Sequence, residues 1–217
     1  MKKLWGAWLV ALMLAACGGD DGGGGGGGGG GGEDDEKPGI GPSTKDPVGT
    51  PFEWPAGLIV KEPIDAYDED HCYRDDQKER EVYGHGGNVR LCLGFTNTTN
   101  QPITVSLPAG LIFVSLNTES QNGLLVQVET FEVPPGDQPF FVNLGLQCLN
   151  AGRDPGFIGD TYKKGPVTQD EELREFLDIL KNKKLTLDNA HIVQDALWNV
   201  TDGDGLTARD REDIGKL

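Results

Sequence analysis

The four cysteines are the residues whose type and spacing point most directly to chemistry. A cysteine thiol can be acylated, can be oxidised to a disulfide, or can act as a nucleophile or a metal ligand. Cys17 lies early in the chain, whereas Cys72, Cys92 and Cys148 are spread through its later parts. These last three cysteines form at most one disulfide among themselves, so one sulfur is left for another role.

A charged stretch from Tyr67 to Arg90 holds a second group of chemically capable side chains, namely His71, Cys72 and His85. The paired ligand spacing of zinc sites is not repeated there, so we expect no metal and no other cofactor. This stretch is the one feature that favours an envelope hydrolase, and the chain has no Gly-x-Ser-x-Gly or His-Glu-x-x-His motif. We therefore expect a protein that is not an enzyme.

Alternating carboxylates at Asp202 and Asp204, followed by Gly205, are typical of a calcium loop. With Gly205 at loop position 6, however, positions 1 and 12 fall on Val200 and Arg211, which do not supply the carboxylates needed there. The pattern therefore predicts a turn.

The first residues have the pattern of a bacterial export signal. Two lysines precede an apolar run from Leu4 to Ala16, and Leu14-Ala15-Ala16-Cys17 resembles the lipobox of bacterial lipoproteins. The resemblance implies removal of residues 1–16, transfer of diacylglycerol to the Cys17 thiol and acylation of the new amine, for which palmitate is the usual label. Because Gly18 is not the Asp that retains lipoproteins in the inner membrane, we expect a lipid-anchored protein at the outer membrane or cell surface.

Residues 17–50 are predicted to form a disordered tether. Gly22 to Gly32 is an unbroken glycine run, and acidic residues flank it on both sides. Such a segment has no side chains to bury and its charges repel one another, so it does not fold. We expect it to hold the folded part away from the membrane.

The charge of the chain excludes some classes of partner. The sequence has 35 acidic and 19 basic side chains, for a net charge of −16. This charge disfavours nucleic acids and anionic lipid headgroups. We expect the partners to be the membrane, through the N-terminal lipid, and an unidentified extracellular ligand or surface.

Apolar side chains alternate with polar ones over much of residues 51–165. Residues 89–95 and 103–107 alternate on either side of a polar turn, which predicts a hairpin with one buried face. The alternation from Phe140 to Cys148 predicts another strand and turns Cys148 toward the core. The pattern is similar to immunoglobulin-like domains of bacterial surface proteins, and we expect an antiparallel β-sandwich.

After residue 165 the apolar period becomes helical. An amphipathic helix is predicted after the capping pattern at Thr168, with further helices starting near Asp188 or Asn189 and at Thr207. The predicted fold class is therefore α+β, with an immunoglobulin-like sandwich over residues 51–165 and a small helical cap over residues 166–217 packed on it.

A series of short motifs lies between about Leu144 and Leu206: Cys148-Leu149-Asn150, Pro155, Gly159, Tyr162, Asp178-Ile179-Leu180-Lys181, Ile192-Val193-Gln194-Asp195-Ala196-Leu197-Trp198 and Thr201-Asp202-Gly203. This series resembles the thioester domains of bacterial surface adhesins. In that family a Cys thiol displaces ammonia from a Gln side-chain amide within a hydrophobic-Gln-x-x-hydrophobic motif. The resemblance implies that Cys148 is the thiol partner and Gln194 the acyl partner.

A buried thioester is an activated acyl group that an amine or hydroxyl of another surface can attack. This assignment leaves Cys72 and Cys92 to pair as a disulfide. The alternative is that Cys148 pairs with Cys72 or Cys92, and that Gln194 is an ordinary boundary residue of a helix. We therefore expect an adhesin-like, lipid-anchored binding module, with a passive structural or accessory lipoprotein as the alternative.

Overall fold

The computed structural model describes residues 37–72 and 82–217 of the chain. The predicted signal segment, Cys17 and most of the predicted tether therefore lie outside the described residues. The strands are β1 Gly49–Thr50, β2 Leu58–Val60, β3 Ile64–Ala66, β4 Val82–Tyr83, β5 Val89–Asn97, β6 Ile103–Leu107, β7 Leu111–Ser115, β8 Gly123–Leu124, β9 Glu129–Val133, β10 Gly136–Cys148 and β11 Thr161–Thr168. The helices are α1 Glu171–Leu180, α2 Ala190–Thr201 and α3 Ala208–Gly215, and a short 3-10 helix, η1 Leu187–Asn189, precedes α2.

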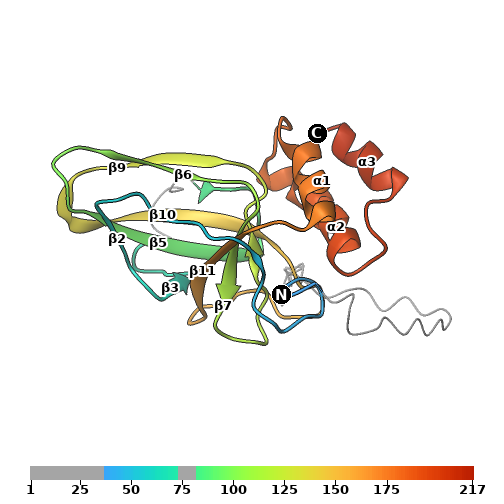
Figure 1. Cartoon of the computed structure of the whole chain (residues 1–217), viewed down its shortest axis with the longest axis horizontal. Helices are drawn as coiled ribbons and strands as arrows, with labels where there is room; N and C mark the ends of the chain where they lie inside the picture. The colour runs from blue at the N-terminus through green and yellow to red at the C-terminus, as the bar shows by residue number, and fades with distance from the viewer. Residues whose placement is uncertain (1–36, 73–81) are drawn as a thin grey trace, which may run out of the picture.

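Six of these strands close into an antiparallel barrel. They follow the order β5, β3, β11, β7, β8 and β10, and β10 pairs back with β5 to complete the ring. Three short strands add to it, since β2 pairs with β5, β4 with β10 and β1 with β11. β6 and β9 form a separate two-stranded ribbon along one side (Figure 1).

The predicted immunoglobulin-like sandwich is wrong, because the main sheet closes on itself. Alternation of apolar residues shows which face of a strand is buried but not whether its sheet closes. The strands that connect β5 to β7 are β3 and β11, and both lack the pattern: β3 is three residues long, and β11 contains Lys163, Lys164 and Pro166. The predicted hairpin is also wrong, since β6 pairs with β9 and not with β5.

The barrel interior holds one of the two apolar cores. As predicted from the alternation, Val142, Leu144, Leu146 and Cys148 all belong to this core. Its other buried members are Ile64, Ala66, Val89, Leu91, Leu93, Phe95, Val105, Leu107, Leu111, Phe113, Leu125, Phe131, Val133 and Tyr162. We call this set the barrel core.

The helices predicted from the period are confirmed, and they gather at one end of the barrel (Figure 1). The N-cap of helix α1 is Asp170, two residues after the predicted cap at Thr168, because the Asp170 carboxylate accepts from the Leu173 N–H at 2.9 Å. The apolar stripes of α1 and α2 pack together with residues from the barrel wall in a second core, which we call the helix core: Ile40, Ile112, Val114, Leu124, Val126, Leu149, Leu173, Phe176, Leu177, Leu180, Leu185, Val193, Ala196, Leu197, Val200 and Ile214.

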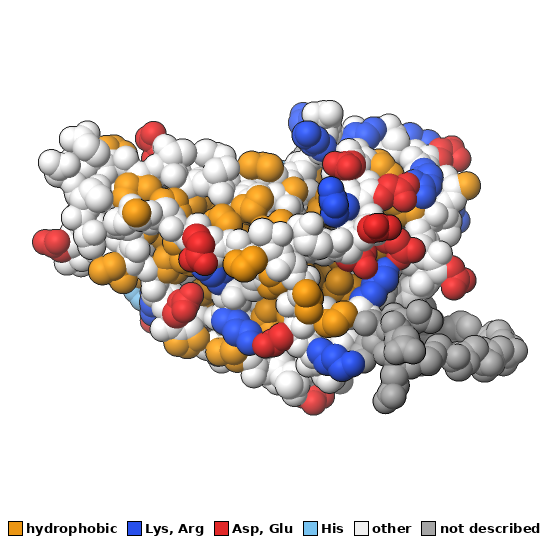
Figure 2. Space-filling view, in the orientation of Figure 1, with side chains coloured by type: hydrophobic (Ala, Val, Ile, Leu, Met, Phe, Trp, Pro, Cys, Tyr) orange, Lys and Arg blue, Asp and Glu red, His pale blue; other side chains and the backbone are white. Residues whose placement is uncertain are grey.

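The helical end carries most of the charged side chains on the face shown in Figure 2, with both signs interspersed, whereas apolar side chains are scattered over the barrel. Within the described ranges, no helix is both long and apolar enough to cross a membrane.

Candidate functional site

The structure brings Cys148 and Gln194 together at the junction between the barrel and the helices. Cys148 is the last residue of β10, and Gln194 lies in the first half of α2. The Cys148 N–H donates to Gln194 Oε1 at 2.7 Å, and Gln194 Nε2 donates to the Cys148 carbonyl at 2.9 Å. The Gln194 amide thus pairs with Cys148 in the same way as a neighbouring strand would.

The pattern of strand pairing explains why the N–H and the carbonyl of Cys148 have no strand partner on one edge of β10. On one edge of β10, Cys148 lies opposite Gly123 of β8. On the other edge, the last pair joins Leu146 to Val89, where β5 begins, so the same register continued by two residues would put Gly87 opposite Cys148. Gly87 lies outside the strand, and the Gln194 amide takes its place. Buried backbone groups need such partners, because an unpaired one costs free energy.

Helix α2 presents two different faces to the two cores. Val193, Ala196, Leu197 and Val200 belong to the helix core, as the sequence period predicts. Gln194 lies beside this stripe, and Trp198, one helical turn later, packs against the barrel core. One face of α2 therefore closes the end of the barrel where Cys148 lies.

The Cys148 side chain and its neighbours are buried from solvent. Cys148 is 0% exposed, Gln194 is 5% exposed, and Tyr162 is also fully buried in the barrel core. The Tyr162 hydroxyl donates to the Gln121 carbonyl at 3.1 Å. Burial raises the pKa of Tyr162 far above its usual value, and the nearby Asp160 and Cys148 raise it further, so the phenol is neutral at physiological pH.

A buried donor without a partner lies in the same region. The indole Nε1 of Trp198 is buried and finds no hydrogen-bond acceptor among the described residues. Gln147, on the opposite face of β10 from the barrel core, is satisfied: its Nε2 donates to the carbonyls of His85 at 3.2 Å and Ala190 at 3.5 Å. The site therefore combines a buried thiol residue and a buried amide, and the same helix carries a buried indole N–H one turn further on.

Comparison of the chain with protein-family models, curated proteins and solved structures finds no match.

The charged stretch from Tyr67 to Arg90 contains a disulfide. Cys72 and Cys92 are bonded to one another, whereas Cys148 lies outside the bond and is buried. If Cys148 is assigned to the thioester, Cys72 and Cys92 are the two cysteines that remain to pair, and this is the pairing in the structure. The alternative in which Cys148 pairs with Cys72 or Cys92 is therefore wrong.

The side chains of the two histidines in that stretch have acidic and aromatic neighbours. The His71 ring stacks on Phe141 with a centroid distance of 4.1 Å and contacts the Asp68 carboxylate at 2.9 Å. His85 lies 3.7 Å from the Glu129 carboxylate. In residues 37–72 and 82–217, no group of three His, Cys, Asp or Glu side chains is arranged to hold a metal ion.

The predicted turn at Asp202 to Gly205 connects α2 to α3. Its Asp202 carboxylate accepts from the Thr201 hydroxyl at 2.5 Å and from the Ala151 N–H at 3.4 Å. The carboxylate therefore joins the end of α2 to the loop that follows β10.

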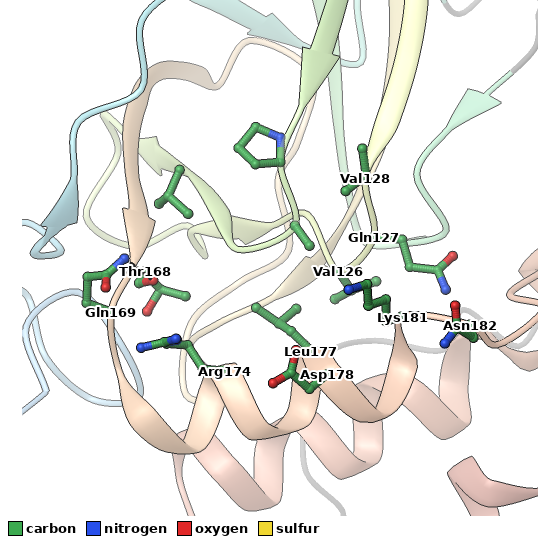
Figure 3. A pocket seen from close by; sticks show the side chains of 13 residues that line it. Val126, Gln127, Val128, Thr168, Gln169, Arg174, Leu177, Asp178, Lys181 and Asn182 are labelled. Carbon is green, nitrogen blue, oxygen red and sulfur yellow. Dashed lines mark hydrogen bonds between the residues drawn. The ribbon is translucent and has the colours of Figure 1, made fainter.

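A separate groove of about 620 Å³ lies between α1 and the barrel (Figure 3). Val126 and Leu177 form apolar parts of its wall, and the charged side chains of Arg174 and Asp178 of α1, and of Lys181 directly after α1, also line it. Neither Cys148 nor Gln194 is among the residues that line it.

Proposed function

We propose that Cys148 and Gln194 form an internal thioester, and that the protein uses it to attach covalently to a partner surface. The observation that carries the proposal is the pair of hydrogen bonds between the Gln194 amide and the Cys148 backbone. The two polar atoms of the Gln194 amide, Oε1 and Nε2, both lie within 3 Å of Cys148 backbone atoms. The acyl carbon is therefore held beside the residue that carries the thiol.

The proposed reaction is an exchange of one acyl bond for another. Cys148 Sγ attacks Gln194 Cδ, the bond from Cδ to Nε2 breaks, and the nitrogen leaves as ammonia with the thiol proton. An amine of a partner then attacks Cδ, an amide bond to Gln194 forms, and the Cys148 thiol is restored. No oxidant or cofactor is needed at either step.

The environment of the two residues supports this chemistry. Holding the Gln194 amide beside the Cys148 backbone lowers the entropic cost of bringing the two residues together for the first step. Burial of Cys148 and Gln194 keeps water from the acyl carbon, and water is the competitor that would hydrolyse the bond. The buried indole N–H of Trp198, one turn from Gln194, is a further donor beside the site.

The consequence is a binding module and not a catalyst, because each chain makes one covalent bond and does not turn over. The partner supplies an amine or hydroxyl on an extracellular surface. An anchor at the other end is part of the proposal: Cys17 carries lipid, and the protein remains at the outer membrane or cell surface.

Methylamine tests the thioester. We expect the wild-type protein to take up one methylamine on Gln194 and to release one thiol on Cys148, because the small amine opens the acyl bond. Peptide mapping by mass spectrometry locates both changes. Cys148→Ala and Gln194→Ala should abolish the uptake.

Gln127→Ala is the matched control. The Gln127 amide also donates to backbone carbonyls, those of Leu180 and Lys183, but it has no cysteine partner in the structure. This variant should take up methylamine as the wild type does. Uptake that survives Cys148→Ala would contradict the assignment.

Palmitate labelling tests the anchor. Radiolabelled palmitate should enter the wild-type protein in cells and be absent from Cys17→Ala. Equal labelling of the variant would contradict lipidation at Cys17.

A further inference from the structure

Residues 37–43, which we call the strap, cross the junction between the barrel and α2 close to Cys148. On the barrel side, the Gly41 N–H donates to the Leu149 carbonyl at 2.9 Å. The buried Asn150 side chain donates to the carbonyls of Gly41 at 2.8 Å and Gly39 at 3.3 Å. Asn122 donates to Gly39 as well, at 3.0 Å. The strap is therefore bonded to the residues that directly follow Cys148 and to the loop before β8.

The strap is also in contact with the helices. Ile40 is 5% exposed and belongs to the helix core. Gly41 lies so close to the end of α2 that an added Cβ would be 2.3 Å from the Thr201 carbonyl oxygen. Lys37 forms an ion pair with Glu172 and lies 3.6 Å from the Asp170 carboxylate at the start of α1.

These contacts join the two elements that meet at the candidate site. Leu149 is the neighbour of Cys148, and Thr201 lies two helical turns after Gln194 on the same helix. While the strap is in place, it contacts both the residues that follow β10 and the end of helix α2. Separating Cys148 from Gln194 therefore requires that these bonds break as well.

We propose that the strap is a latch that holds Cys148 and Gln194 together and closed to solvent. The role of the latch in covalent attachment rests on the proposed thioester, because an amine reaches the acyl carbon only after the strap has left. The latch does not depend on the thioester, because it is formed by the contacts of residues 37–43 with the barrel and the helices.

The point at which the chain enters the strap determines how the latch opens. Residues 1–36 join it at Lys37, so tension on that part of the chain acts first on the ion pairs of Lys37, then on the Gly39 carbonyl and then on Gly41. Bonds loaded one after another break at lower force than bonds loaded together. A module anchored through its N-terminus and pulled by a partner therefore opens at this end first.

Hydrogen exchange of the full chain tests the latch. Gly41→Ala forces the strap away from Thr201, since position 41 has a φ of +58° and no room for a Cβ. We expect the Cys148 N–H to exchange at least about tenfold faster than in the wild type. Gly152→Ala is the control, because an added Cβ at Gly152, in the neighbouring loop, has no atom within 4 Å.

A second variant covers the case in which Gly41→Ala does not fold. Lys37→Glu replaces an attractive contact with repulsion from Asp170 and Glu172 at the first residue of the strap, without changing the core. It should also accelerate exchange at Cys148. Faster exchange in residues 37–43 with no change at Cys148 would overturn the latch.

Methylamine uptake by the same variants separates the two proposals. Faster uptake together with faster exchange supports both the latch and the thioester. Faster exchange at Cys148 with no uptake in any variant, including the wild type, supports the latch and contradicts the thioester.

Discussion

In a Cys148→Ala background, where no thioester forms and Gln194 keeps its amide, replacing Gln194 with Leu is expected to lower the free energy of unfolding by about 3 kcal/mol, because two buried backbone groups lose their partner. The Cys148 N–H and carbonyl both bond to the Gln194 amide, and the position is 5% exposed, so water does not readily replace it. Leu has a similar volume, and the loss therefore reports the polar pairing and not a cavity. Urea unfolding measured at pH 7 gives the value.

His191→Leu is the matched control for that measurement. His191 is an exposed residue in the first turn of the same helix, and its replacement should change the free energy of unfolding by less than about 0.5 kcal/mol. If Gln194→Leu is no more destabilising than this control, the amide does not hold the end of β10 to α2.

Removing the disulfide is expected to have an effect of similar size. Cys72 and Cys92 are separated by 20 residues in sequence, and a bond that closes a loop of that length stabilises the fold by about 3 kcal/mol through the entropy of the unfolded chain. Cys72→Ser and Cys92→Ser should each lower the free energy of unfolding by this amount in urea.

The double variant provides the check on this interpretation. Because the two sulfurs act as one bond, the double variant should be about as stable as either single variant. Additive losses in the double variant, or a wild type whose stability is unchanged by reduction, would contradict a stabilising disulfide between Cys72 and Cys92.

The helical end of the molecule could be predicted from local sequence, because helix signals lie within a few residues of one another. The Thr207 hydroxyl accepts from the Asp210 N–H as the capping pattern predicts. The buried residues of α1 are Leu173, Phe176, Leu177 and Leu180, which have the helical spacing i, i+3, i+4 and i+7. The alternation of apolar residues along β10 also predicts correctly that Cys148 faces the core.

The closure of the barrel could not be predicted in this way, since it depends on pairing between strands far apart in the chain. β11 lies between β3 and β7, although its lysines and proline interrupt any alternation. A local pattern contains no information on which strand a given edge will meet. The sandwich was expected because both architectures bury one face of antiparallel strands.

The strap was missed for a related reason. Its sequence, Lys-Pro-Gly-Ile-Gly-Pro-Ser, is typical of a linker, and only the fold brings Asn122 and Asn150 to its carbonyls. The one signal in the sequence is Ile40, an apolar side chain between two glycines, which the structure buries in the helix core.

The mass of the intact, untreated protein tests the central claim most directly. A thioester between Cys148 and Gln194 expels ammonia, so the chain should weigh about 17 Da less than its sequence and its N-terminal processing require, once the two hydrogens lost to the Cys72–Cys92 disulfide are taken into account. The deficit should be absent from Cys148→Ala and from Gln194→Ala, each compared with its own sequence mass. A wild-type mass that shows the disulfide alone would contradict the thioester, and Gln194 would then serve only to join α2 to the end of β10.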